Sequence, residues 1–171
     1  MSAHTRWLAI AVAALATGCL GVPTPEPQYF TLSATSAAKA AALAARPELG
    51  LVLGQVELPR TLDRAELVTR EGPHALRVWN LVRWGGSLRS DVQRVVAGDL
   101  AELLGTARIA VYPNEARFPV SYRVLLELLE FGSAPGRPVA LRARWSIAAP
   151  DGHALAVATT VIISTGKARY A

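Results

Sequence analysis

The chain has 171 residues, of which 51% are hydrophobic and 18% are charged, with 18 Lys and Arg against 13 Asp and Glu. This much apolar material can bury a core for one globular domain, which excludes a wholly disordered protein. A single Cys excludes an internal disulfide framework, and the basic residues are dispersed, which argues against a nucleic-acid partner.

The N-terminus has the layout of a bacterial export signal over residues 1–18. Its apolar run, Trp7–Ala16, has about half of the ~20 residues that a membrane-spanning helix needs. The small residues Thr17 and Gly18 precede Cys19, an arrangement that resembles a lipobox. We therefore predict signal cleavage between Gly18 and Cys19 and lipidation of Cys19, whose acyl chains would hold the protein on a membrane.

The residues after Cys19 predict which membrane holds the protein and how far the folded domain lies from it. Leu20 stands where an inner-membrane retention signal would place Asp, so resemblance to bacterial lipoproteins predicts the periplasmic face of the outer membrane in a Gram-negative bacterium. Alternating prolines predict that Leu20–Gln28 is an extended tether about 28 Å long, at ~3 Å per residue, so residues 19–28 are the lipidated Cys and its tether. Residues 29–171 are then the folded domain.

The first half of this domain is predicted to contain short strands. Strands and turns are expected, in chain order, as a strand at Tyr29–Leu32, an irregular segment at Ser33–Arg46, a strand at Leu49–Leu58, a tight turn at Thr61–Arg64, and a hairpin of Glu66–Arg70 with Ala75–Asn80. Pro59 ends the second of these strands, because proline cannot donate a hydrogen bond to a neighbouring strand.

A long amphipathic helix follows. An apolar stripe at helical spacing runs from Leu88 to Leu104, Ser87 is a suitable N-cap, and Gly105 is a suitable C-terminal stop. The pattern predicts one continuous helix that buries one face.

Four strands are predicted after the helix, at Arg108–Tyr112, Tyr122–Phe131, Val139–Ala148 and Ala154–Ser164. The third alternates apolar and polar side chains, as expected of a strand with one face in the core. The expected fold class is α+β, with a largely antiparallel sheet of sequentially paired strands packed against the long helix.

No set of residues predicts an enzyme or a metal site. Ser87 lacks the glycine that follows the serine of a nucleophile elbow, so helix capping explains it better. His74 and His153 lie in predicted turns without the spacing of a metal site or a triad. Glu127 and Glu130 are predicted to lie on opposite faces of one strand. We therefore expect no catalytic residue, no metal and no cofactor.

A distributed pattern of residues carries a family resemblance. Its members are Val56–Pro59, Leu62–Arg64, Leu67–Arg70, Trp84, Leu88, Leu103–Gly105 and Tyr122–Val124. Together they resemble the ABC-type transport auxiliary lipoproteins, the PqiC/YmbA-like family that accompanies MCE-domain intermembrane transport systems. The similarity runs from about Tyr29 to about Gly166.

The resemblance implies an outer-membrane lipoprotein, not an enzyme, that faces the periplasm and docks an MCE-domain transport protein of the inner membrane in a pathway for phospholipid or related molecules. Leu62, Asp63 and Arg64 match the family's turn motif, so they are candidate partner-binding residues. The alternative is that Asp63 bonds turn amides and Arg64 pairs locally.

Family members usually continue into a C-terminal helix, whereas this chain stops at Tyr170 and Ala171. We therefore expect the sheet to lack part of its cover and to expose an apolar face, which a second copy in a homo-oligomer would cover.

Two other functions remain open at this point. The protein would instead bind a small hydrophobic ligand or lipid itself if a large apolar cavity lay between helix and sheet, behind Trp145. A filled core with an exposed apolar patch would favour docking. A periplasmic hydrolase would need a convergent Ser, His and acid, and no motif supports one.

Overall fold

The computed structural model describes residues 25–34, 44–72, 74–133 and 136–167, so the predicted signal peptide, Cys19 and most of the segment predicted to be irregular lie outside the described residues. The elements along the described chain are β1 (Gln28–Phe30), β2 (Leu51–Glu57), β3 (Glu66–Arg70), β4 (Leu76–Trp84), α2 (Leu88–Leu104), β5 (Ile109–Val111), β6 (Tyr122–Gly132), β7 (Pro138–Ala148) and β8 (Ala154–Lys167).

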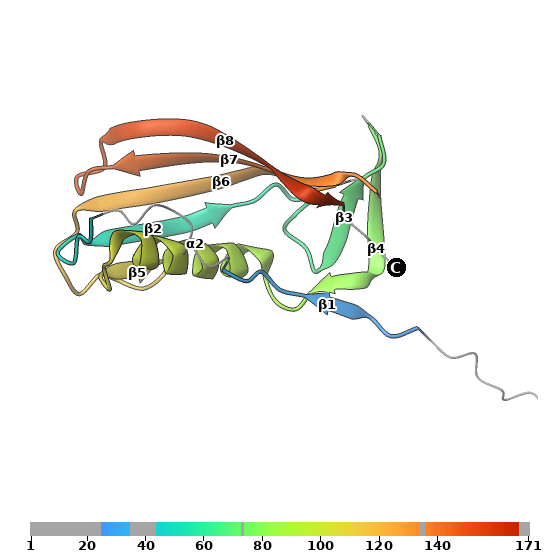
Figure 1. Cartoon of the computed structure of the whole chain (residues 1–171), viewed down its shortest axis with the longest axis horizontal. Helices are drawn as coiled ribbons and strands as arrows, with labels where there is room; N and C mark the ends of the chain where they lie inside the picture. The colour runs from blue at the N-terminus through green and yellow to red at the C-terminus, as the bar shows by residue number, and fades with distance from the viewer. Residues whose placement is uncertain (1–24, 35–43, 73, 134–135, 168–171) are drawn as a thin grey trace, which may run out of the picture.

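The strands form two mixed sheets, one in the order β1-β4-β3 and the other in the order β5-β2-β6-β7-β8 (Figure 1). The pairs β3–β4, β6–β7 and β7–β8 are antiparallel, whereas β1–β4, β2–β5 and β2–β6 are parallel. The α+β class is confirmed. The prediction that strands pair in chain order is wrong at β2. The chain forms β3, β4 and α2 before β5 and β6 return beside β2, and long crossovers of this kind produce parallel neighbours.

The helix α2 has the predicted bounds and caps. The Ser87 side chain accepts a hydrogen bond from the Ser90 amide at 3.5 Å. Gly105 adopts φ 57° and its amide donates to carbonyls of the last helical turn. A left-handed residue of this kind satisfies carbonyls that would otherwise lack partners, and glycine adopts it without steric cost.

The core lies between α2 and the five-stranded sheet. The helix packs on β2 and β5, and β7 and β8 extend beyond it (Figure 1). The centre of the core consists of Val56, Leu88, Val92 and Leu128, none more than 8% exposed. Gln93 fixes the helix to β2 by donating a hydrogen bond to the Gly54 carbonyl at 3.1 Å. Packed side chains therefore fill the space between helix and sheet.

A β-bulge in β6 changes which of its side chains share a face. The register shifts between Leu128 and Glu130, so Glu127 pairs with Arg144 and Glu130 with Arg142, two positions further along β7. Glu127 and Glu130 therefore lie on the same face, and the prediction of opposite faces was wrong because an extra residue in a strand inverts the alternation beyond it.

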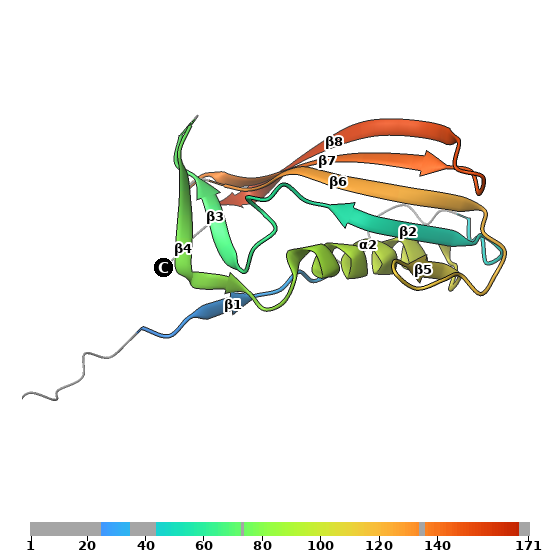
Figure 2. The same ribbon diagram turned by 180° about the vertical axis from the view of Figure 1, so that it is seen from behind.

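The smaller sheet lies at one end of the molecule, where β1 enters it (Figure 2). The predicted hairpin is confirmed, with β3 as predicted and β4 extended to Trp84. Trp84 stacks on Phe131 of β6 with ring centroids 5.9 Å apart, which joins the two sheets. Offset and stacked aromatic pairs of this kind add about 0.5–1.5 kcal/mol beyond the apolar area that they bury.

Candidate functional site

The strand β8 exposes a row of large apolar side chains at the edge of the five-stranded sheet. No charged residue occurs from Ala154 to Gly166. Five side chains here are more than half exposed, and we call them the β8 patch: Leu155, Val157, Val161, Ile162 and Ile163. A long, uncharged edge strand presents unpaired backbone groups and apolar side chains to any partner that can add a strand or a face.

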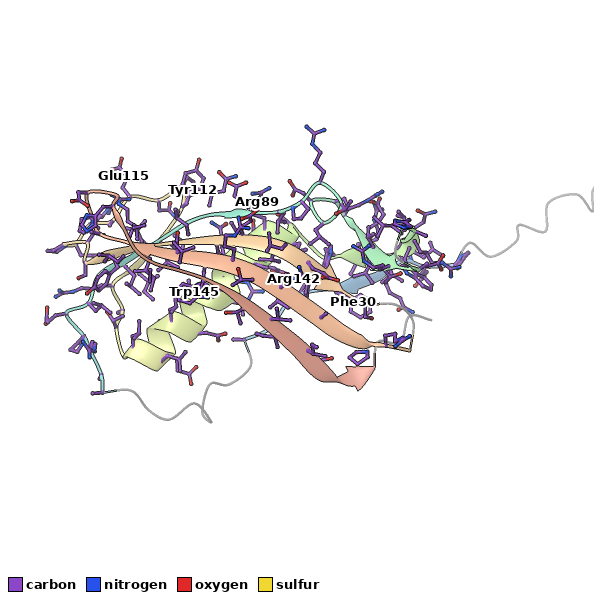
Figure 3. All side chains as sticks on the ribbon, turned by 90° about the horizontal axis from the view of Figure 1, so that it is seen from above. Phe30, Arg89, Tyr112, Glu115, Arg142 and Trp145 are labelled. Carbon is purple, nitrogen blue, oxygen red and sulfur yellow. The ribbon has the colours of Figure 1, made fainter. Side chains whose placement is uncertain are left out.

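All of these side chains except Ile162 project from the face of the sheet that is opposite α2. Val161 lies beside Arg142, and Val157 lies beside Ser146, which in turn lies beside Leu125 of β6. Arg142 and Trp145, both labelled in Figure 3, belong to opposite faces of β7. A shallow groove of about 450 Å³ lies around Leu125 and Val157. This outer face therefore combines apolar rows with charged ones.

The charged rows are already neutralised within the sheet. Arg144 contacts Glu127 at 3.1 Å, and Arg142 contacts Glu130 at 3.5 Å. These exposed pairs contribute little to stability. Because their charges cancel locally, the apolar rows between them are the distinctive feature of this face.

Trp145 lies on the helix side of β7 and is half-buried. Its indole N–H donates to the Thr160 hydroxyl of β8 at 3.0 Å, so its polar atom is satisfied within the sheet. Core side chains pack between helix and sheet, the hollow that Trp145 lines is the open groove around Leu125 and Val157, and five of the exposed apolar side chains lie on β8. This is the arrangement that favours docking over a ligand enclosed behind Trp145.

The turn residues Leu62, Asp63 and Arg64 all have local contacts. Leu62 packs against the core cluster. The Asp63 carboxylate accepts a hydrogen bond from Arg89 at 2.8 Å, and Arg64 pairs with Glu66 at 3.0 Å. These contacts fasten the turn, and partner binding by it stays a prediction.

Arg89 is the residue that fixes this turn, and sequence reasoning missed it. Its guanidinium donates to the Val56 carbonyl and to Asp63, and the side chain is only 21% exposed. It thereby connects the first turn of α2 to the end of β2 and to the turn. Nothing in its sequence position beside Leu88 distinguishes it from a solvated helix residue.

Two carboxylates, one near the turn and one near β1, have lowered pKa values. The pKa of Glu66 is lowered, first by a backbone hydrogen bond and then by the one from Arg64. The pKa of Asp91 is lowered chiefly by a hydrogen bond from Arg94, at 2.9 Å, and further by the Leu32 amide, at 3.1 Å. Asp91 thus attaches the segment after β1 to the helix.

The remaining candidate side chains lie in ordinary surroundings. His74 lies exposed in the β3–β4 turn, and His153 lies in the β7–β8 turn with its Nδ1 2.6 Å from an Asp151 oxygen. Within the described ranges, no three His, Cys, Asp or Glu residues are grouped so as to hold a metal ion. No helix in the same ranges is long and apolar enough to cross a bilayer.

Comparison with known families decides the identity of the domain. The model of the family described as "ABC-type transport auxiliary lipoprotein component" matches residues 30–169. The chain belongs to this family. It is therefore a lipoprotein component of an ABC-type transport system, a membrane-anchored protein of the bacterial periplasm, as the sequence resemblance predicted. A comparison with curated proteins gave no match.

Solved structures share the fold. Protein XCC0632 from Xanthomonas campestris, of family DUF330, aligns with a TM-score of 0.65 at 12% identity, over 80% of this chain and 77% of that one. A second crystal structure, of an uncharacterized protein, aligns with a TM-score of 0.63 at 15% identity, over 84% of each chain. At these identities the likeness concerns the fold alone.

Proposed function

We propose that this auxiliary lipoprotein is anchored in the outer membrane by acylated Cys19 and docks an MCE-domain assembly that moves phospholipid or related molecules across the periplasm. In this proposal residues 1–18 are the signal peptide, 19–28 the lipidated tether and 29–171 the docking domain, which performs no catalytic step. Family membership supports the transport role.

The observation that carries the docking proposal is the β8 patch. Its five apolar side chains are 52–66% exposed on an uncharged edge strand. Interfaces bury side chains of this kind at their centre, and the core of an interface is depleted in charge. The ion pairs of Arg142 and Arg144 border the patch, as a polar rim borders an interface core.

An affinity capture from detergent-solubilised bacterial envelopes tests this proposal. Full-length protein, its Cys19→Ser variant and a Val161→Lys variant serve as baits, and mass spectrometry identifies what each recovers. A matched control is Leu81→Lys, because Leu81 is an exposed apolar residue of the other sheet. We expect the wild type and Leu81→Lys to recover an MCE-domain protein and Val161→Lys to lose it.

Two results would refute docking through β8. An MCE-domain protein recovered equally by Val161→Lys would place the contact elsewhere, and none recovered by the acylated wild type would remove the docking role. Unmodified Cys19, seen by intact mass, would remove the anchor. A second copy of the chain is the competing occupant of β8, and light scattering on wild type and Val161→Lys distinguishes it by an oligomer that only the wild type forms.

A further inference from the structure

A second hollow lies between the two sheets, and its lining residue Ala140 pairs in register with Ile163 of the β8 patch. It has a volume of about 500 Å³ and lies between the β3–β4 hairpin, the turn at Leu62, the end of β6 and the start of β7. We call it the inter-sheet cleft. Its volume falls within the range of about 300–1,000 Å³ that is usual for small-molecule sites.

The floor of the inter-sheet cleft is formed where the end of β6 meets β3 and β4. Gly132 has φ 145°, and a β-carbon there would lie 3.3 Å from the Val68 carbonyl oxygen, so the end of β6 approaches β3 closely. Phe131, which lines the cleft, is supported from behind by the stacked Trp84 ring. Leu62, Val68 and Phe131 are only partly buried, so they present apolar surface to the hollow.

Among the charged side chains that line the inter-sheet cleft, one arginine is free to bind an anionic ligand. Its two carboxylates have arginine partners that do not line it: Glu71 pairs with Arg77 at 2.5 Å, and Glu130 with Arg142 at 3.5 Å. Two arginines also line the cleft: Arg70, which already has an interaction within the protein, and Arg137, which is exposed and whose guanidinium has no hydrogen bond or ion pair within the described part of the chain. A guanidinium is well suited to a phosphate or carboxylate.

We propose that the inter-sheet cleft binds an anionic lipid, with the acyl chain against Leu76 and Phe131 and the phosphate or carboxylate group at Arg137. The cleft belongs to the sheet that β1 enters, and β1 begins nine positions after Cys19. With the proposed anchor at Cys19, an extended stretch of that length would span about 28 Å and would keep the cleft within reach of the bilayer surface. Lipid binding here goes beyond docking through β8 and does not require it.

Photolabelling with site mapping tests this inference. Full-length protein is reconstituted into phosphatidylcholine vesicles that contain one diazirine-bearing probe: phosphatidylglycerol, palmitate or phosphatidylcholine. After irradiation, mass spectrometry of peptides locates the adducts. We expect saturable labelling of peptides that contain Leu76 or Phe131 by an anionic probe, and about tenfold less by the zwitterionic one. Preference for phosphatidylglycerol identifies a membrane phospholipid, and preference for palmitate a free fatty acid.

Two matched pairs of variants separate the cleft from the rest of the surface. Arg137→Glu should reduce labelling about tenfold, whereas Arg144→Glu, the same charge change on β7 outside the cleft, should not. Leu76→Ser should also reduce it, whereas Leu81→Ser, at a similarly exposed position of β4, should not. Circular dichroism confirms that each variant is folded.

Equal labelling of all four variants, or adducts confined to other peptides, would overturn the lipid site. Labelling by phosphatidylcholine as strong as by either anionic probe would also overturn it, because Arg137 would then not distinguish anionic from zwitterionic lipid. None of these results affects capture through β8, so failure of the lipid site and failure of the docking proposal are distinguishable.

Discussion

Replacement of Leu128 by Ala tests whether the helix–sheet core holds the fold together. Leu128 is 2% exposed and lies in the central cluster with Val56, Leu88 and Val92. Removing three buried carbons at about 0.8 kcal/mol each loses about 2.4 kcal/mol, and the cavity left behind raises the cost to about 3 kcal/mol. For a domain of this size the unfolding midpoint should fall by roughly 6–12 °C.

The matched control is Leu125→Ala on the same strand, because Leu125 is 51% exposed on the outer face. Its loss should cost about 1 kcal/mol or less. Thermal and urea unfolding of the full-length protein in non-ionic detergent, both followed by far-ultraviolet circular dichroism, measure the midpoint and the free energy of unfolding for both variants. Equal destabilisation by the two substitutions, or a loss below about 1 kcal/mol for Leu128→Ala, would refute the assignment of the core to this face.

Gly50, Asp91 and Arg64 each give a further test. Gly50→Ala should lower the urea midpoint, because a β-carbon there would lie 2.1 Å from the backbone oxygen of Pro119; an unchanged midpoint would contradict this close approach. Asp91, whose pKa is lowered from 3.8 chiefly by Arg94, contributes stability that is fully present above that unfolded value and is lost as the pH falls through the lower folded pKa. Urea midpoints of wild type and Asp91→Asn should therefore differ most above about pH 5 and converge only as the pH falls below 3.8 and through the folded pKa, and a difference that stays constant as the pH falls would contradict the pairing. Arg64→Ala removes an exposed ion pair and should change unfolding free energy by less than about 1 kcal/mol, whereas loss of MCE-protein capture at unchanged stability would assign its turn to docking.

The exposed apolar face and the inter-sheet cleft differ in whether they could be predicted from the sequence. The family resemblance predicted an exposed apolar face on the sheet, and the β8 patch is an exposed apolar surface. The inter-sheet cleft was not predicted. It depends on Leu62 and Val68 on one side and Arg137 on the other, which are far apart in the sequence and come together only because two sheets meet.

The sequence by itself determined the local elements of this protein. The helix from Leu88 to Leu104, its cap at Ser87 and its stop at Gly105 follow from apolar spacing and from side chains that satisfy backbone groups a few residues away. Such interactions lie within one segment, so the segment's own residues specify them.

The tertiary structure decided the strand order and the faces of the strands. Only the long crossover back to β2 places β5 and β6 beside it, and only the bulge in β6 brings Glu127 and Glu130 to one face. Arg89 likewise gains its role from Asp63 and the Val56 carbonyl, which lie on other segments. These features depend on contacts between residues distant in sequence, so the residue pattern within a single segment does not predict them.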